Sequence, residues 1–188
     1  MVDRFSRLLA LIALVASCAS TQGAGLFQPE PDPFFPAACV AHWEPASIPL
    51  IMVATDQVLV DHLTQAATFW NGLVGLELVS VLQVDTLPVI ADGRIVPVSF
   101  TPIMNAPTRV GLTKFALGSR CELLRAEVTI LTTTRPEIFP QVVAHEVGHV
   151  LGLAHSYEAG DLMWPETSPG PMIVAPETID ALQDAYRY

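Results

Sequence analysis

The sequence has few basic residues. Only 9 Lys and Arg stand against 19 Asp and Glu among 188 residues, and the formal net charge is −10. Nucleic-acid binding needs a basic surface that neutralises phosphates, and the chain contains no cluster of Lys or Arg. Long apolar runs are also missing after about residue 16, because proline, glycine and charged residues interrupt the chain. The composition therefore excludes a polytopic membrane protein and argues against nucleic acid as a partner.

The N-terminal residues have the layout of an export signal. Arg4 and Arg7 precede the apolar run Leu8–Ala16, and small residues follow it. A charged start, a short apolar stretch and a small-residue cleavage site are typical of a signal peptide. We therefore expect residues 1–17 to be removed and the protein to be exported.

The new N-terminus has two possible fates. Val15-Ala16-Ser17-Cys18 resembles a bacterial lipobox, which implies that Cys18 carries a lipid and becomes the first residue. The alternative is ordinary cleavage near Ser20 and release of the protein. The expected location is the bacterial cell envelope, with a lipid anchor in the outer membrane as the only membrane attachment, or the extracellular medium. Residues 18–38 are rich in proline and glycine, which predicts a lipid-anchored or disordered linker.

The three cysteines are consistent with this setting. If Cys18 carries the lipid, Cys39 and Cys121 remain as a pair in an oxidising compartment. We predict a disulfide between them. An alternative role for Cys39, as a thiolate that blocks a metal, lacks the surrounding motif that such propeptides carry.

Residues 39–188 predict a single α+β domain without internal repeats. Apolar residues at three- and four-residue spacing indicate helices, and β-branched apolar runs indicate strands. Asp92-Gly93 predicts a hairpin turn, and Thr55 or Asp56 would cap the first helix. The helices are expected at residues 56–73, 137–151 and 176–186, and the strands at residues 46–54, 76–84, 95–100 and 126–131.

The chemistry of the chain is concentrated between His145 and His155. His145 and His149 are four residues apart, so on a helix their imidazoles lie on one face and can reach the same cation. Gly152 permits the left-handed turn that would end the helix and fold His155 back as a third ligand. Three nitrogen ligands leave a fourth tetrahedral position open for water, which is typical of a catalytic zinc site.

Glu146 completes the predicted site. It follows the first ligand and can approach a zinc-activated water without binding the metal. Because zinc lowers the pKa of its water to about 7, a carboxylate can take the proton and pass it to the leaving amine. Two histidines on an apolar helix are often structural, but the addition of Gly152 and His155 makes a chance pattern improbable.

The pattern HExxHxxGxxH resembles the metzincin proteases. Ser156 and Leu162-Met163-Trp164-Pro165 make the chain similar to the matrixins, the matrix metalloprotease type. In that family a methionine eight residues after the third ligand forms the Met-turn beneath the zinc, a position that Met163 occupies. The resemblance covers roughly residues 46–188.

The resemblance implies a zincin-like single domain with a twisted, mixed sheet, two long helices, a Met-turn and a C-terminal helix. In such domains an antiparallel edge strand pairs with the extended substrate, and residues 126–131 are our candidate for that strand. One catalytic zinc is expected and calcium is not, because residues 85–125 lack the family's Asp/Gly-rich loops and extra histidine. His42 and His62 are then ordinary residues rather than ligands.

The sequence therefore predicts a monomeric zinc endopeptidase that acts on a protein or peptide substrate. Its ligands would be His145, His149 and His155, and Glu146 would act as general base and acid. The alternative from another functional class is a zinc-binding envelope lipoprotein without proteolysis, which binds a partner peptide in the cleft. The presence of Glu146 favours the enzyme, because metal binding alone has no use for that carboxylate.

Overall fold

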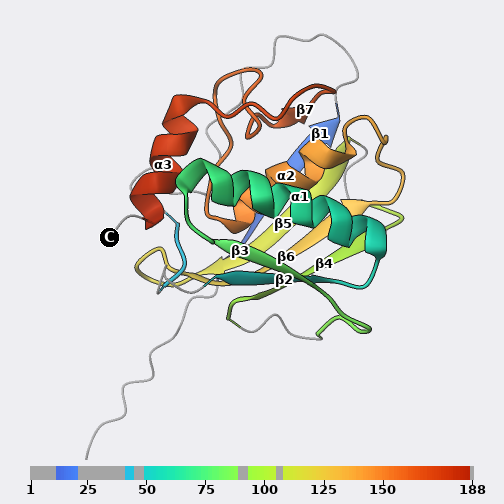
Figure 1. The fold of residues 1–188 in the computed structure, drawn as a ribbon, viewed down its shortest axis with the longest axis horizontal. Coiled ribbons are helices and arrows are strands. Elements are labelled where there is room, and N and C mark those ends of the chain that lie inside the picture. The colour runs from blue at the N-terminus through green and yellow to red at the C-terminus, as the bar shows by residue number, and fades with distance from the viewer. Residues whose placement is uncertain (1–11, 21–40, 45–48, 89–92, 105–107, 187–188) are drawn as a thin grey trace, which may run out of the picture.

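A computed structural model describes residues 12–20, 41–44, 49–88, 93–104 and 108–186 of the chain. These residues form one seven-stranded sheet and three helices (Figure 1). The strands are β1 (Ile12–Ser20), β2 (Leu50–Ala54), β3 (Val79–Gln83), β4 (Ile95–Thr101), β5 (Arg109–Leu117), β6 (Leu123–Leu131) and β7 (Glu166–Thr167). The helices are α1 (Gln57–Val74), α2 (Phe139–Val150) and α3 (Pro176–Tyr186).

The sheet has the strand order β3-β2-β4-β6-β5-β1-β7. The first four strands of this order are parallel, and β5 runs antiparallel to β6. This order corrects one prediction. Residues 126–131 belong to β6, which pairs with β4 on one side and β5 on the other. They form an internal strand, and the antiparallel strand at that end of the parallel group is β5.

β1 lies along the outer edge of β5. The two strands are antiparallel, with Ile12 opposite Leu117 and Cys18 opposite Gly111, and the end of β1 pairs in parallel with β7. β1 also contacts α2 (Figure 1). In the full chain, part of the segment that the sequence assigns to the export signal therefore pairs with the edge of the sheet.

Local sequence explains the bounds of α1. The side chain of Asp56 accepts hydrogen bonds from the backbone N–H groups of Val58 and Leu59, at 2.8 and 3.3 Å, and so caps the first turn. The helix ends at Gly75, which has a φ of 70°. One face is buried and includes Leu63 and Trp70, as the apolar spacing predicts.

The second helix is buried along nearly its whole length. Every residue from Val142 to Val150 is buried, because α2 packs against both α1 and β5. Pro140 lies in the first turn, where the N–H that proline lacks would have no helical partner. Trp70 of α1 donates a hydrogen bond from Nε1 to the carbonyl of Ala144 at 2.9 Å, which links the two helices in the core.

The α+β fold class and the three helices are confirmed. The predicted hairpin partly involves residues 89–92, and the linker mainly residues 21–38; both ranges lie outside the described residues. No strand or helix was predicted at residues 109–117, which form β5. Among the described residues, no helix has the length and apolarity needed to cross a membrane.

Candidate metal centre

Three histidines meet at the C-terminal half of α2. His145 and His149 are fully buried one turn apart on the helix, and His155 approaches from the following loop. One nitrogen of each lies within 4.8 Å of the others, and Nε2 of His149 is 3.2 Å from Nε2 of His155. Two nitrogens of a tetrahedral zinc site with Zn–N distances of about 2.0–2.1 Å lie about 3.3 Å apart. The trio therefore has the spacing of a three-nitrogen metal site.

Backbone carbonyls fix the orientation of two of the rings. His145 Nδ1 is 2.6 Å from the carbonyl oxygen of Leu162, and His149 Nδ1 is 2.8 Å from that of Leu153. A carbonyl can only accept, so each Nδ1 carries the proton and each Nε2 keeps a lone pair. Nε2 of His145 is buried without a hydrogen-bond partner. A buried lone pair that faces two other imidazoles fits a cation such as zinc.

The electrostatics of the site keep the helical histidines neutral. Burial lowers the pKa of His145 to about 3, and nearby His155 acts in the same direction, whereas the hydrogen bond to Leu162 opposes it. Burial, together with His145 and His155, also holds the pKa of His149 well below its usual value. Neutral imidazole is the form that binds metals, so both residues are ready to act as ligands at neutral pH.

Glu146 is a fully buried carboxylate held by β5. Its Oε2 accepts a hydrogen bond from the Thr113 hydroxyl at 2.6 Å, while Oε1 has no partner. A Cβ atom at Gly111 would overlap Oε1, so the glycine makes room for the carboxylate against the strand. Burial raises the pKa of Glu146 to about 8, and Thr113 and Arg109 partly oppose this shift. A cation on the histidines would also favour the charged form.

The turn after α2 depends on Gly152. This residue has a φ of 92°, and a Cβ atom there would overlap the carbonyl group of Ala41. Two aromatic side chains bind the carbonyls at the end of the helix. Trp43 Nε1 donates to Val150 at 2.7 Å, and the Tyr186 hydroxyl donates to Leu151 at 3.0 Å. The backbone conformation of Gly152 and the hydrogen bonds from Trp43 and Tyr186 thus fix the point at which the chain turns back to His155.

Met163, the predicted Met-turn residue, packs against α2 at Gly148. It is fully buried, and its sulfur lies so close to Gly148 that a side chain on that residue would displace the methionine. The Met163 carbonyl accepts a hydrogen bond from the Ser156 N–H at 2.8 Å. This bond ties the methionine to the residue after His155.

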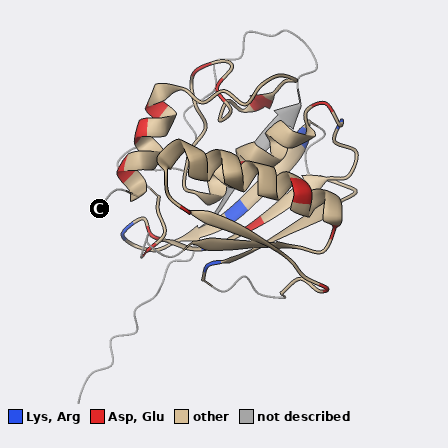
Figure 2. Ribbon diagram, in the orientation of Figure 1, with Lys and Arg blue, Asp and Glu red and all other residues tan. Residues whose placement is uncertain are grey.

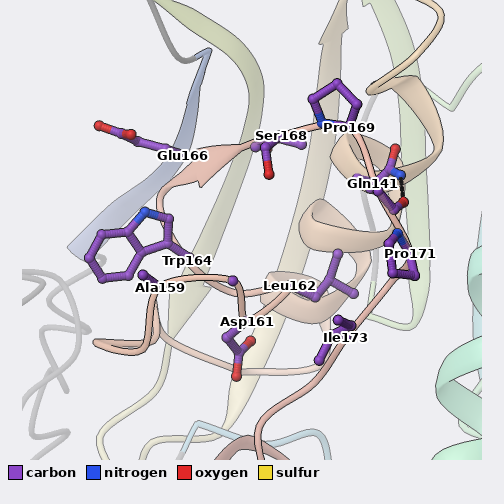
Figure 3. A pocket seen from close by; sticks show the side chains of 13 residues that line it. Gln141, Ala159, Asp161, Leu162, Trp164, Glu166, Ser168, Pro169, Pro171 and Ile173 are labelled. Carbon is purple, nitrogen blue, oxygen red and sulfur yellow. Dashed lines mark hydrogen bonds between the residues drawn. The ribbon is translucent and has the colours of Figure 1, made fainter. Parts of the chain in front are cut away.

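A cavity of about 360 Å³ lies between Gln141 of α2 and the loop that follows the histidines (Figure 3). Gln141, one helical turn before His145, lines it together with Leu162 and the segment from Glu166 to Pro171. The Gln141 amide donates a hydrogen bond to the carbonyl of Gly170, which holds that segment against the helix (Figure 3). The charged residues of the lining, Asp161 and Glu166, are both acidic.

The remaining candidate residues lie elsewhere. Cys121 is disulfide-bonded. Cys39, its predicted partner, lies outside the described residues, and two hydrogen bonds hold His42 beside the Cys121–Leu123 segment. The backbone of Cys18 lies in β1, and its lipidation stays a prediction. His62 packs against Phe139 in α2 rather than joining the cluster.

The residues that hold the histidines and Glu146 in place were not predicted from the sequence. Thr113 belongs to the unassigned strand, and the carbonyls of Leu153 and Leu162 carry no side-chain signature. The apolar run of β5, bounded by Pro107 and Gly118, is the signal that could have located Thr113.

Comparisons with known proteins point to the same region. The matrixin peptidase family profile matches residues 117–186, which include the histidine cluster. Interstitial collagenase of Bos taurus is 47% identical over 47 residues, which are 24% of this chain and 10% of the collagenase. The alignment with this relative thus spans about a tenth of its length. This part of the chain is similar to a family of metallopeptidases.

Proposed function

We propose that this protein is an exported zinc endopeptidase. The observation that carries the proposal is the arrangement of three histidine nitrogens within 4.8 Å of one another beside a buried carboxylate, Glu146. The similarity of residues 117–186 to the matrixins supports the same conclusion. His145, His149 and His155 would hold one zinc ion, and calcium is not expected.

The residues of the site have separate tasks. A bound zinc would supply a Lewis acid that activates water and polarises the scissile carbonyl. Glu146 Oε1, which has no hydrogen-bond partner, is free to accept the proton of the attacking water. Thr113 holds Oε2 and so orients the carboxylate. The same carboxylate then returns the proton to the leaving amine.

The edge of β5 is the proposed binding surface for the peptide substrate. In the full chain this edge already accepts a strand, because β1 pairs with it antiparallel from Leu117 to Arg109. Cys18, near the end of that register, is opposite Gly111, and Gly111 lies against the Glu146 carboxylate. Removal of residues 1–17 would leave most of this edge available for an extended peptide in the same direction.

The cavity at Gln141 is suited to a substrate side chain next to the scissile bond. Its position between Gln141 and the segment from Glu166 to Pro171 places it one helical turn from the first ligand. Because Asp161 and Glu166 are its charged lining residues, we expect acidic side chains to be disfavoured there. Cleavage of a proteome-derived peptide mixture would measure this preference, and frequent acidic residues at that position would contradict it.

The expected location and partners follow from the sequence and remain proposals. Export, with a lipid on Cys18 or release after cleavage near Ser20, would bring the enzyme to the cell envelope or beyond. Several acidic residues are spaced along α3, while Lys and Arg are scattered over the fold (Figure 2). This distribution of charge favours a protein or peptide partner over nucleic acid. We expect a monomer. Mass spectrometry of the membrane fraction would identify a lipid-modified Cys18.

Substitution of Glu146 tests the proposed activity. Glu146→Gln should keep the zinc content and lower the rate of peptide cleavage at least about 100-fold, because the general base is lost. Glu137→Gln is the matched control, since Glu137 is an exposed carboxylate just before the same helix. Zinc would be measured by elemental analysis and cleavage with a broad peptide library.

Two results would reject the mechanism. Equal cleavage rates for Glu146→Gln and the unsubstituted protein would exclude Glu146 as the base. If both proteins bound zinc and neither cleaved any peptide, a zinc-binding envelope lipoprotein that holds a partner peptide would replace the enzyme.

A further inference from the structure

We propose that Asp161 is a positioning residue for the first metal ligand, and that it acts on His145 through the peptide bond between Leu162 and Met163. The inference rests on the metal site proposed above. Asp161 belongs to neither the ligand set nor the proton-transfer machinery. Its connection to His145 is a chain of hydrogen bonds.

Asp161 is one of two buried carboxylates among the described residues, and the other is Glu146. Asp161 is 6% exposed and accepts three hydrogen bonds. Oδ1 accepts from the N–H of Met163 at 2.6 Å, and Oδ2 accepts from the N–H of Ala175 and the hydroxyl of Thr178, each at 2.8 Å. A buried carboxylate with this many donors is held in one orientation.

The bond to Met163 connects the carboxylate with the ligand. The N–H of Met163 and the carbonyl of Leu162 belong to the same planar peptide group. Asp161 binds the N–H end of that group, and His145 Nδ1 donates to the carbonyl end at 2.6 Å. The carboxylate thus fixes the plane of the peptide and increases the negative charge on the carbonyl oxygen. Such coupling strengthens neighbouring hydrogen bonds by about 10–30%.

A stronger hydrogen-bond acceptor at Nδ1 of the ring raises the basicity of Nε2, the nitrogen that would bind the metal. Outer hydrogen-bond partners of a ligating imidazole fix its tautomer and raise the basicity of the other nitrogen. In His145 that other nitrogen is Nε2, which is buried and without a partner. Asp161 would therefore both orient the His145 ring and increase its donor strength toward zinc.

The second helical histidine provides an internal comparison. His149 Nδ1 donates to the carbonyl of Leu153 at 2.8 Å. The N–H of Ala154 belongs to the same peptide group as this carbonyl, and no carboxylate among the described residues accepts a hydrogen bond from it. The hydrogen bond from His145 to Leu162 is therefore the shorter of the two, and its acceptor peptide group is the one that a carboxylate also binds, as the proposal requires.

A purely structural role for Asp161 would give a different result. The carboxylate also ties the loop to the start of α3 through Ala175 and Thr178, so its loss lowers stability in either case. Thr178→Val is the matched control, because it removes one donor to the carboxylate and leaves the bond to Met163. The comparison of Asp161→Asn with Thr178→Val separates the tie to α3 from the effect on His145.

The test uses the full-length protein and measures zinc affinity by competition with a chromophoric chelator. Asp161→Asn should weaken zinc binding about 10- to 100-fold, the usual effect of losing an outer partner of a ligating histidine. The absorption bands of the Co²⁺-substituted protein should shift in the same variant. Thr178→Val should leave both the affinity and the Co²⁺ spectrum unchanged. Unchanged values for Asp161→Asn, or equal losses in both variants, would overturn the proposal.

A second measurement needs no substitution. In the metal-free, full-length protein labelled with ¹⁵N-histidine, the proton on His145 Nδ1 should resonate further downfield than the proton on His149 Nδ1. Coincident resonances, or the reverse order, would overturn the proposal even if Asp161→Asn did not fold. If the unsubstituted protein bound no metal, the proposed function would fail, and this measurement would still decide the role of Asp161.

Discussion

The two halves of the candidate metal centre are held in place by different forces. The helical half, with His145 and His149, lies on α2, where every residue from Val142 to Val150 is buried. The loop half, from Leu153 to Ala175, contains His155 and Met163 and has only the two-residue strand β7 as regular structure. Besides the burial of Leu162 and Met163, polar contacts hold this loop, through Asp161 and Gln141 in particular.

This difference shows how a rigid site can be built on an irregular segment. Apolar packing fixes the position of a helix but gives little control over the rotation of a single imidazole. The carbonyls of Leu153 and Leu162, both in the loop, supply that control for the helical histidines. The loop therefore orients the ligands that the helix carries. Four predictions test this division, in order of expected effect.

The largest effect should come from the junction between the halves. Gly152→Ala should lower the free energy of unfolding by about 3 kcal/mol and reduce zinc content, because it combines a left-handed φ with overlap at Ala41. Gly160→Ala is the control: its φ of 95° is similar, but open space surrounds it, so the cost should be about 1 kcal/mol. Urea unfolding and elemental analysis measure both variants. Equal losses would mean that backbone strain alone matters.

The helical half should respond to pH in the metal-free protein. The pKa of His145 is about 3 in the folded state and 6.5 in the unfolded state, so its contribution to stability is lost as the pH falls from 6.5 toward 3. Glu146 has the opposite sign. Its pKa is raised from 4.5 to about 8, so its contribution is full below pH 4.5 and is lost as the pH rises through 8. The two groups oppose each other between pH 7 and pH 5.

Glu146→Gln should reveal how the protonation of the histidines affects stability, because it removes the opposing contribution of Glu146. Between pH 7 and pH 5, the free energy of unfolding should fall by about 2 kcal/mol more in this variant than in the unsubstituted protein. Urea unfolding in the presence of a chelator measures the difference. The same acid sensitivity in both proteins would show that Glu146 is not protonated in the folded, metal-free state.

A smaller effect is expected at the contact between the helix and β5. Thr113→Val removes the hydrogen bond to Glu146 Oε2, so the pKa of Glu146 should rise and the acid limb of the pH–rate profile should move to higher pH. Peptide cleavage at pH 7 should fall about tenfold, while zinc content stays unchanged. Thr68→Val, an exposed site on α1, serves as control. An unaltered pH profile would contradict the role assigned to Thr113.

The smallest effect on the free energy of unfolding is expected for an exposed ion pair, which shows how much an exposed polar contact contributes in this protein. Lys114 and Glu127 form an ion pair at 3.0 Å across β5 and β6, with both side chains about half exposed. Lys114→Gln should change the free energy of unfolding by less than about 1 kcal/mol, because solvent screens the pair. Thermal unfolding at low and high salt measures it. A larger loss would mean that exposed contacts also hold the sheet, which would weaken the contrast with the buried contacts of the loop.

Much of the fold could be predicted from apolar periodicity. The expected helix at residues 56–73 corresponds to α1, and Asp56 caps it as one of two proposed residues. The strand β5 was missed because it is buried on both faces over Val110–Thr113, so polar and apolar residues do not alternate there. The choice of residues 126–131 as the edge failed for a related reason: strand order depends on long-range pairing, which local sequence does not contain.

The site was predictable where its geometry is local and not where it depends on tertiary contacts. His145 and His149 are one helical turn apart, and a helix alone brings them together. The role of Asp161 depends on partners at Met163, Ala175 and Thr178, and only the folded loop brings these groups to one carboxylate. The backbone carbonyls that bind the imidazoles cannot be read from side-chain types at all.

The bonds from Trp43 and Tyr186 to neighbouring carbonyls of α2 have a consequence for proteolytic damage. These two residues come from opposite ends of the domain, yet both hold the same helix terminus. Trimming by other proteases at either flank would therefore displace His155 without removing a single ligand. Such a cleaved protein would keep all three histidines but bind the metal less tightly.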